Sequence, residues 1–460
     1  MEAPARDAGK ANIILMNCDD LGYGDLACYG SPCNSTPHLD RLAAEGMRFT
    51  DFYMASPVCS PSRGAMLTGC YPPRIGFGSF DGRGVLFPGD PIGLNPSEIT
   101  IASLLRDAGY ATKIVGKWHC GDQPEFLPTR HGFDSYYGLP YSNDMGRQKV
   151  DDKWPPLPLL RDEEVMQEQP DQSGLTERYV EESLRFIREQ RQRPFFLYLA
   201  HMHVHLPIYA PARFLRESRN GAYGAAVACI DWAAGVIMAE LRRLGLEDNT
   251  MVIFTSDNGS RCRGEGGSNG VLRGIKTTTW EGGQRVPCIL RWPGHIPAGS
   301  TCTGLATAMD FYPTLAAIAG CAVPTDRIID GRDITPLMLS GGAAASPREA
   351  FFYYNRNDLE AVRDGRWKLH VRKSRQAIAE LYDLRNDPGE NRNVHADEPA
   401  VVARLTALLE RCREDLGDEA LGIAGQNVRP AGRVASPRTL TQYRPDHPYM
   451  IATYDLQERG

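Results

Sequence analysis

Short apolar runs of strand length alternate with longer amphipathic runs over most of this chain. The strand-like runs lie at 11–17, 47–55, 110–118, 194–201, 250–259 and 285–294. The runs with helical periodicity lie at 36–46, 99–109, 176–190, 225–244 and 310–320. Strand, helix and strand in repeated order is typical of a large, mostly parallel sheet sandwiched by helices. We therefore predict an α/β fold, in which ligands bind at the carboxyl ends of the strands.

Two changes in composition divide the chain. Residues 146–174 are rich in Pro, Asp, Glu and Gln, and we expect a long surface loop there. A second break lies in SGGAAASPRE at 340–349, after which extended runs flank an RDGR turn and a helical run follows. We expect a large domain at 1–340, a smaller α+β domain with an antiparallel sheet and a helix at 346–423, and an irregular tail at 424–460.

Composition and charge exclude some functions. The 460 residues are 42% hydrophobic and 23% charged, which is typical of a globular protein with a sizeable core. The net charge of −6 and the lack of a dense Lys/Arg block argue against a nucleic-acid partner. We see no signal-peptide core and no apolar run that approaches the ~20 residues of a membrane span. We expect no membrane partner and a cytoplasmic location, or a periplasmic or secreted one if a signal was removed; the oligomeric state is left open.

Acidic side chains follow two of the predicted strands. Asp19 and Asp20 come directly after the run at 11–17, and Asp257 and Asn258 end the run at 250–259. Adjacent carboxylates repel each other, so a buried strand end is a costly place for them unless a cation holds them. Carboxylate and amide oxygens favour calcium or magnesium over zinc. The alternative is that both pairs are only turn residues or helix caps.

Basic and imidazole side chains follow the other strands. They are Lys117, His119, His201, His203, His205 and Lys276. In an extended strand, the alternating histidines at 201–205 would share one face and could form a metal triad. The alternative is that one of them has a role in the site while the others pack or form hydrogen bonds. We favour this alternative for His201. Cations that converge on a metal imply an anionic substrate group, with Arg63 as a further member. The pattern indicates hydrolysis or transfer of a phosphoryl-like or sulfuryl-like group.

A cysteine occupies an unusual setting in SPVCSPSRGAMLTG, residues 56–69. Cys59 lies among serines and prolines, four residues before Arg63, where a loop turns into a helix. A structural cysteine would normally lie among apolar neighbours. The residues themselves leave open whether Cys59 is a thiolate nucleophile or has another function.

The residues described above, together with the segments that surround them, resemble the sulfatase family of the alkaline-phosphatase-like superfamily. CSPSRGAMLTG resembles the signature Cys-x-Pro-x-Arg, and GKWHCGD resembles the second signature Gly-Lys-Trp-His. The order of the segments around NCDDLGYGD, HMHVHLP, SDNG, KTTTWEGG and LYDLRNDPGE also resembles the family, over 11–410. Within the family, the chain is most similar to the arylsulfatase A and N-acetylgalactosamine-6-sulfatase type. Cys18, before the Asp pair, and Cys120, after His119, depart from the usual pattern of the family, and neither departure affects the implied mechanism.

The resemblance implies a role for Cys59. In this family the cysteine is oxidised to formylglycine by a formylglycine-generating enzyme, and Arg63 then holds the hydrated aldehyde. One hydroxyl of the hydrate attacks sulfur and the other expels sulfate, which divides one difficult step into two. A serine at this position would be trapped as a sulfate ester.

The resemblance also implies the remaining roles, residue by residue. One calcium ion is bound by the side chains at five positions: Asp19, Asp20, Cys59 as formylglycine, Asp257 and Asn258. Asp257 takes the proton of the attacking hydroxyl. The sulfate oxygens are bound by Lys117, His205 and Lys276, and either His205 or Lys276 protonates the departing alcohol. His119 deprotonates the second hydroxyl. His203 aligns with a substrate-binding histidine, and the leaving group is contacted by Ser142, Asn143 and Asp144, unless these three form only a turn.

The expected activity is therefore hydrolysis of a sulfate monoester. The substrate is expected to be a small sulfated sugar or glycan fragment, with aryl sulfates as assay substrates. One alternative is a phosphonate or phosphate ester hydrolase that uses the same formylglycine. The other is a non-catalytic binder of sulfated glycans with an unmodified Cys59.

Overall fold

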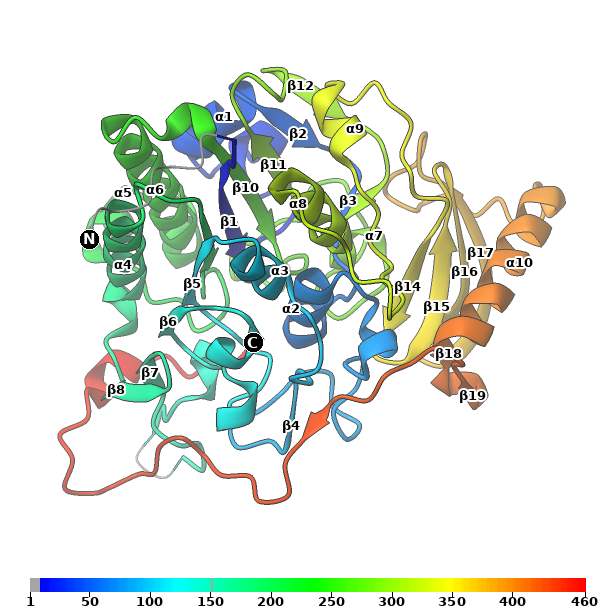
Figure 1. Ribbon diagram of the computed structural model, residues 1–460. Helices are drawn as coiled ribbons and strands as arrows, with labels where there is room; N and C mark the ends of the chain where they lie inside the picture. Colours follow the sequence, from blue (N-terminus) through cyan, green and yellow to red (C-terminus); the bar gives the residue numbers. More distant parts are fainter. Residues whose placement is uncertain (1–8, 150–151) are drawn as a thin grey trace.

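The computed structural model describes residues 9–149 and 152–460 and is built around one ten-stranded sheet (Figure 1). From edge to edge the strands are β12 (Ser300–Cys302), β2 (Met47–Phe49), β11 (Cys288–Arg291), β10 (Thr250–Ser256), β1 (Asn12–Cys18), β9 (Phe195–Ala200), β5 (Ala111–Gly116), β6 (Ser135–Gly138), β7 (Pro158–Arg161) and β8 (Glu164–Glu168). The five strands from β10 to β6 are parallel, whereas β11, β7 and β8 run antiparallel to their neighbours. The α/β prediction is confirmed, with a sheet that is parallel at its centre and mixed overall.

Both faces of the central strands are buried because helices cover them. In β1, Ile13 and Leu15 belong to one hydrophobic cluster, and Ile14 and Met16 belong to another. The first cluster includes side chains of α2 (Cys59–Thr68), α3 (Ile101–Asp107), α8 (Phe311–Ala319) and α9 (Thr335–Leu339). The second includes side chains of α1 (Pro37–Ala44), α4 (Leu175–Glu189) and α6 (Gly221–Arg243). Burial on both faces explains why the parallel strands read as continuous apolar runs.

Helix α6 is the core helix of the second cluster. It is the one helix in the described part of the chain that is long and apolar enough to cross a membrane by length and composition, and 72% of its apolar window is buried inside the protein. It packs against α1, α4 and α5 (Ala212–Glu217), which Figure 1 shows grouped on one side of the sheet. Its apolar character is therefore accounted for by packing within the fold.

A smaller sheet and a helix lie at the other end of the molecule (Figure 1). The antiparallel strands are β14 (Phe351–Asn355), β15 (Asp358–Arg363), β16 (Trp367–Lys373) and β17 (Gln376–Asp383), and α10 (Pro399–Leu416) packs on them. A buried ion pair and a hydrogen bond join this sheet to the large domain: Lys368 Nζ lies 2.9 Å from Glu281 Oε1, and Tyr353 donates a hydrogen bond to the same oxygen. Glu281 belongs to the short helix α7 (Glu281–Gln284), so the two sheets are anchored to each other.

The structure corrects two sequence expectations. Residues 146–174 are more than a surface loop, because they contain the hairpin of β7 and β8, in which Leu159 and Leu160 are fully buried and extend the large sheet. The flanking Pro and acidic residues concealed this short strand. The run at 47–55 divides into β2 and β3 (Phe52–Tyr53), which pair with different partners.

The last residues return from the smaller domain to the large one. β19 (Ile423–Ala424) pairs with β18 (Gly417–Asp418), and β20 (Gly432–Arg433) pairs with β4 (Ile92–Gly93). Most of the remaining tail is irregular, as Figure 1 shows in red. It reaches the loops at the end of the large sheet, where the amide of Gly460 donates to Asp144 Oδ2 at 3.0 Å.

Candidate active site

Polar side chains gather where four neighbouring strands end. Asp19 and Asp20 follow β1, Asp257 and Asn258 follow β10, Lys117 and His119 follow β5, and the three histidines of 201–205 follow β9. These strands are adjacent and parallel in the order β10, β1, β9 and β5. Their carboxyl ends therefore meet at one edge of the sheet, and all of these side chains are buried there.

Helix α2 brings Cys59 to the same place. Cys59 is the first residue of α2, and its Sγ lies 3.4 Å from Asp19 Oδ1. The loop before it is tied to the loop that carries Lys276, because the amide of Thr277 donates to Pro57 O at 2.9 Å. A helix N-terminus carries a partial positive charge, which favours anions beside it.

Arg63 lies one turn further along α2 and points into the cluster. Its Nε donates to Asp257 Oδ2 at 2.9 Å, and its Nη1 donates to Lys117 O at 2.8 Å. Its Nη2 also lies 3.5 Å from Asp19 Oδ2. The fully buried guanidinium thus fixes the ends of β1, β5 and β10 relative to one another.

Two lysines complete the charge compensation. Lys117 Nζ contacts Asp19 Oδ2 and lies 3.2 Å from Ser142 Oγ, and Lys276 Nζ lies 2.9 Å from Asp20 Oδ2. Burial opposes the charge on Asp19, but Lys117, His205 and Arg63 together hold the pKa of Asp19 well below its usual range. Burial and the negative charge of Asp19 raise the pKa of Asp257 to about 6. The site therefore holds several charges at high density and in close balance.

The acidic residues fit a hard metal ion. Ligand atoms of Asp19, Asp20, Cys59 and His205 lie within 4.8 Å of one another. Asn258 Nδ2 donates to Asp20 Oδ1 at 2.8 Å, while Asn258 Oδ1 is buried without a hydrogen-bond partner among the described residues. A buried amide oxygen with no partner is costly unless a cation or water satisfies it. Carboxylate and amide oxygens together form the donor set that calcium and magnesium prefer.

The histidines differ in their surroundings. The strand expected at 201–205 is absent because β9 ends at Ala200, so the alternation argument was wrong. His201 and His203 are buried, and neither ring has a hydrogen-bond partner in the described part of the chain. Burial lowers the pKa of His201 to about 3 and that of His203 to about 4. His205 instead reaches the cluster, with Nε2 3.9 Å from Asp20 Oδ2.

His119 is placed to accept a proton. Its Nε2–H donates to Leu86 O at 3.1 Å, which leaves Nδ1 as the unprotonated nitrogen, and Nδ1 has no partner among the described residues. Burial, followed by the charge of Lys117, lowers the pKa of His119 well below its usual value. The imidazole is therefore neutral at neutral pH, with Nδ1 free to act as a base.

The Cys59 thiol is a weak nucleophile in these surroundings. Burial, followed by the negative charge of Asp19, raises the pKa of Cys59 well above the usual value. Because the thiolate is the reactive form of cysteine, these groups do not favour an unmodified Cys59 as the nucleophile.

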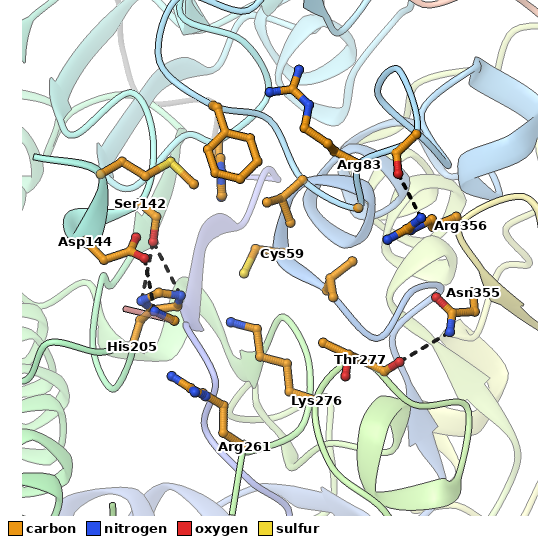
Figure 2. Close-up of a pocket in the computed structure, with 18 of the residues that line it drawn as sticks. Cys59, Arg83, Ser142, Asp144, His205, Arg261, Lys276, Thr277, Asn355 and Arg356 are labelled. Carbon is orange, nitrogen blue, oxygen red and sulfur yellow. Dashed lines mark hydrogen bonds between the residues drawn. The ribbon is translucent and has the colours of Figure 1, made fainter. Parts of the chain in front are cut away.

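A pocket of about 460 Å³ opens above these residues (Figure 2). Six of the predicted site residues are placed around it or at its floor: Cys59, His119, Ser142, Asp144, His205 and Lys276. Asn143 does not line the pocket, because its Nδ2 donates to Gln172 Oε1 and to Pro207 O, both at 3.0 Å. Its side chain is thus used to hold its own loop.

The sequence analysis missed the outer part of this pocket. The missed side chains are Val58, Arg83, Val85, Phe87, Met145, Arg261, Arg263, Thr277, Asn355 and Arg356. They come from separate loops, from the last residue of β14 and from the turn that follows it, so no local motif joins them. Phe87 forms part of an apolar wall, stacked on Trp154 with ring centroids 5.6 Å apart.

The fold and the site together define an enzyme with the alkaline-phosphatase-like architecture. Comparison with known proteins supports this class: the Sulfatase family profile matches residues 11–321, and that of N-sulphoglucosamine sulphohydrolase, C-terminal, matches 275–415. This chain belongs to the sulfatase family, as its sequence motifs predicted. It is a sulfatase that hydrolyses sulfate esters; the family generally uses a metal and formylglycine.

Individual relatives agree with this assignment. The chain is 46% identical over 383 residues to N-acetylgalactosamine-6-sulfatase of Rattus norvegicus, covering 78% of this chain and 71% of the relative. It is 40% identical over 432 residues to arylsulfatase A of Homo sapiens, covering 84% of each. Among solved structures, Ps i-CgsB in complex with k-i-k-neocarrahexaose is 30% identical, with a TM-score of 0.78 over 87% of this chain and 92% of that chain. Relatives named as sulfatases do not support the alternative of a non-catalytic binder.

Proposed function

We propose that this sulfatase removes sulfate from a sugar or glycan fragment, by means of formylglycine formed from Cys59 and one calcium ion. The observation that carries the proposal is the position of Cys59 at the floor of the pocket, 3.4 Å from Asp19 and surrounded by buried, charge-compensated groups. The names of two relatives, an N-acetylgalactosamine-6-sulfatase and a protein in complex with k-i-k-neocarrahexaose, support a sugar substrate. The overall reaction adds water across the sulfur–oxygen bond and releases an alcohol and hydrogen sulfate.

Four residues are proposed to hold the calcium ion: Asp19, Asp20, Asp257 and Asn258. Their oxygen atoms are buried, and Asn258 Oδ1, which has no hydrogen-bond partner among the described residues, is available as a ligand for a cation. When bound, the ion supplies positive charge that lowers the pKa of a hydroxyl beside it. Asp257 then accepts the proton of that hydroxyl, and Arg63 keeps the Asp257 carboxylate in place through its hydrogen bond at 2.9 Å.

The modification of Cys59 by a formylglycine-generating enzyme is part of the proposal. Once formed, the hydrated aldehyde at position 59 would supply one hydroxyl for attack at sulfur and a second whose deprotonation would expel sulfate. His119 is the proposed base for the second hydroxyl. Its unprotonated Nδ1, depressed pKa and position in the pocket support this role.

Lys117, Lys276 and His205 are proposed to bind the sulfate oxygens. Burial disfavours the charge of Lys276, but Asp20 beside it raises its pKa, so the ammonium group persists at neutral pH. Burial and the charge of Lys276 lower the pKa of His205. An anionic sulfate between them would favour protonation of His205. His205 or Lys276 thereby provides the proton for the departing alcohol.

Mass spectrometry of the tryptic peptide 49–63 tests the proposal directly, with kinetics on the same sample. We expect formylglycine at position 59, and turnover of 4-nitrophenyl sulfate that exceeds turnover of 4-nitrophenyl phosphonate esters. An active sample that contains only cysteine at position 59 would overturn the nucleophile. A preference for the phosphonate would instead support the phosphonate or phosphate ester hydrolase.

A further inference from the structure

The mouth of the active-site pocket carries an excess of positive charge over negative charge. Five cationic side chains line the pocket, namely Arg83, Arg261, Arg263, Lys276 and Arg356, against one acidic side chain, Asp144. This contrasts with the chain as a whole, whose net charge is −6. A local excess of one sign in a cleft of an oppositely charged protein focuses the field on ligands of the other sign.

Two of these cations are neutralised within the protein. Lys276 lies 2.9 Å from Asp20 Oδ2, and Arg83 Nη2 lies 2.7 Å from Asp90 Oδ1. Within the described residues, none of Arg261, Arg263 and Arg356 forms an ion pair with a carboxylate. The backbone amide of Arg263 donates a hydrogen bond to Glu265 Oε2 at 2.8 Å, but the guanidinium of Arg263 forms no ion pair with a carboxylate among the described residues. Three guanidinium groups at the mouth therefore have no counter-charge from residues 9–149 and 152–460.

Two of these three arginines are held in place by backbone carbonyls. Arg356 Nη1 donates to Gly82 O at 2.8 Å, and Arg261 Nη1 donates to Arg459 O at 2.7 Å. A guanidinium has five N–H donors, so each retains donors for a ligand after these bonds. A carbonyl oxygen carries no net charge, so these bonds leave the positive charge of each guanidinium uncompensated. Because they also fix the position of the side chain, they lower the entropic cost of binding a ligand there.

The arginines come from both domains. Arg356 lies in the turn between β14 and β15 of the smaller sheet, and Asn355 beside it donates to Thr277 O at 3.4 Å. Arg261 and Arg263 lie in the loop that follows Asn258. Figure 2 shows Cys59 between Arg83 and Arg261, with Arg356 on another side of the pocket. The smaller domain thus contributes to the mouth while the large domain supplies the floor.

We propose that Arg261, Arg263 and Arg356 form a subsite for a second anionic group of the substrate, a carboxylate or a further sulfate. The inference rests on the proposed function, because it takes the scissile sulfate to lie at Cys59. Guanidinium groups bind carboxylate and sulfate oxygens through paired, charge-assisted hydrogen bonds. The enzyme then prefers sugars that carry at least two anionic groups over singly sulfated ones.

Kinetics with three probes test the subsite and identify its ligand. The probes are N-acetylgalactosamine 6-sulfate, N-acetylgalactosamine 4,6-disulfate, and a disaccharide of a hexuronic acid joined to N-acetylgalactosamine 6-sulfate. We expect the wild type to show a kcat/KM at least about tenfold higher for one of the two doubly anionic probes than for the singly anionic one. The doubly anionic probe with the higher kcat/KM identifies the second group as a sulfate or a carboxylate.

The triple variant Arg261→Gln, Arg263→Gln and Arg356→Gln should reduce that ratio by about tenfold or more. Arg216→Gln is the matched control, because Arg216 is an exposed arginine of α5 that does not line the pocket. This control should leave the ratio unchanged. An equal loss on all probes, or no loss on either doubly anionic probe, would overturn the subsite.

Calorimetry separates the subsite from the chemistry. The probes are titrated into a Cys59→Ala protein with and without the three glutamines, so that no turnover is needed. Tighter binding of a doubly anionic probe that is lost with the glutamines supports the subsite even if the wild type fails to release sulfate, which would overturn only the proposed function. Equal binding of all three probes by the Cys59→Ala protein would overturn the subsite alone.

Discussion

The charged groups at the floor and at the mouth of the pocket are stabilised in different ways. At the floor, Lys117 and Lys276 lie against Asp19 and Asp20, and Arg63 lies against Asp257, all of them buried. At the mouth, Arg263 and Arg356 are exposed and Arg261 is half-buried, and none of the three has a carboxylate partner among the described residues. Buried charges must be paired to be stable, whereas solvent stabilises unpaired charges at the rim.

The difference separates chemistry from selection. A buried, paired floor keeps a fixed geometry for one small anion, which suits catalysis by preorganised charges. An exposed rim on loops tolerates change in sequence and can accept different ligands. We therefore expect substitutions at the floor to abolish turnover of every substrate, and substitutions at the mouth to change the choice of substrate.

The largest expected effect is at the floor. Cys59→Ala or Asp257→Ala should reduce kcat on 4-nitrophenyl sulfate by at least about 10³-fold. The first substitution removes the proposed nucleophile, and the second removes the base that accepts its proton. The circular dichroism spectrum should stay that of the wild type. Full activity in either purified variant would contradict the mechanism and remove the basis for distinguishing floor from mouth.

Removal of calcium should affect both stability and activity. A chelator should abolish turnover and lower the melting temperature by several degrees, because it leaves three carboxylates and an orphaned amide oxygen close together without the ion. Addition of calcium should restore both quantities. An active, unshifted protein after exhaustive chelation would show that the lysines and Arg63 suffice to balance the carboxylates.

Glu281 anchors the smaller sheet, which carries Arg356, to the large domain. Glu281 is fully buried, accepts hydrogen bonds from Tyr53 and Tyr353, and pairs with Lys368. Glu281→Gln leaves Lys368 without that counter-charge, so we expect a loss of about 3 kcal/mol in unfolding free energy.

The same variant sharpens the comparison between floor and mouth. Because Glu281 joins the smaller sheet to the large domain, its loss should raise KM for doubly anionic probes more than for 4-nitrophenyl sulfate. Chemical denaturation and steady-state kinetics on one preparation measure both quantities. Equal changes in KM for both substrates would show that the smaller domain does not position the mouth.

The smallest expected effect is on the pH dependence of the free energy of unfolding, and it comes from the buried carboxyl group of Asp122. Asp122 lies three residues after His119, and its Oδ2 accepts a hydrogen bond at 2.7 Å from the amide of Gly89, two residues after the pocket residue Phe87, so it joins these two segments. Burial raises the pKa of Asp122 to about 7. The folded state therefore binds the proton more tightly than the unfolded chain, and this contribution to stability, complete below about pH 4, is lost as the pH rises to about 7.

Asp122→Asn should remove that pH dependence. Relative to the wild type at pH 8, the variant should gain on the order of 2 kcal/mol, with little difference at pH 4. Urea denaturation at the two pH values measures it. Parallel pH profiles for the two proteins would show that Asp122 is not the group responsible.

Much of the floor could be predicted from the sequence because its residues directly follow apolar strands. In parallel sheets, neighbouring strands end at one edge, so the acidic residues after β1 and β10 were expected to meet, and the amide of Asp20 donates to Asp257 Oδ1 at 3.3 Å. The histidines at 201–205 were read as a strand because their alternation is local, but the chain leaves the sheet at Ala200. The hairpin of β7 and β8 was missed because its apolar residues are few and its flanks resemble a loop.

The sequence by itself determined the class of fold, the family and the residues of the floor. Periodic apolar runs report burial, and the motifs around Cys59, Lys117 and Asp257 are short and contiguous. Only the tertiary structure decided which side chains form the mouth. Arg83, Arg261 and Arg356 are far apart along the chain and come together through packing of the two domains, and long-range packing leaves no local signal in a single sequence.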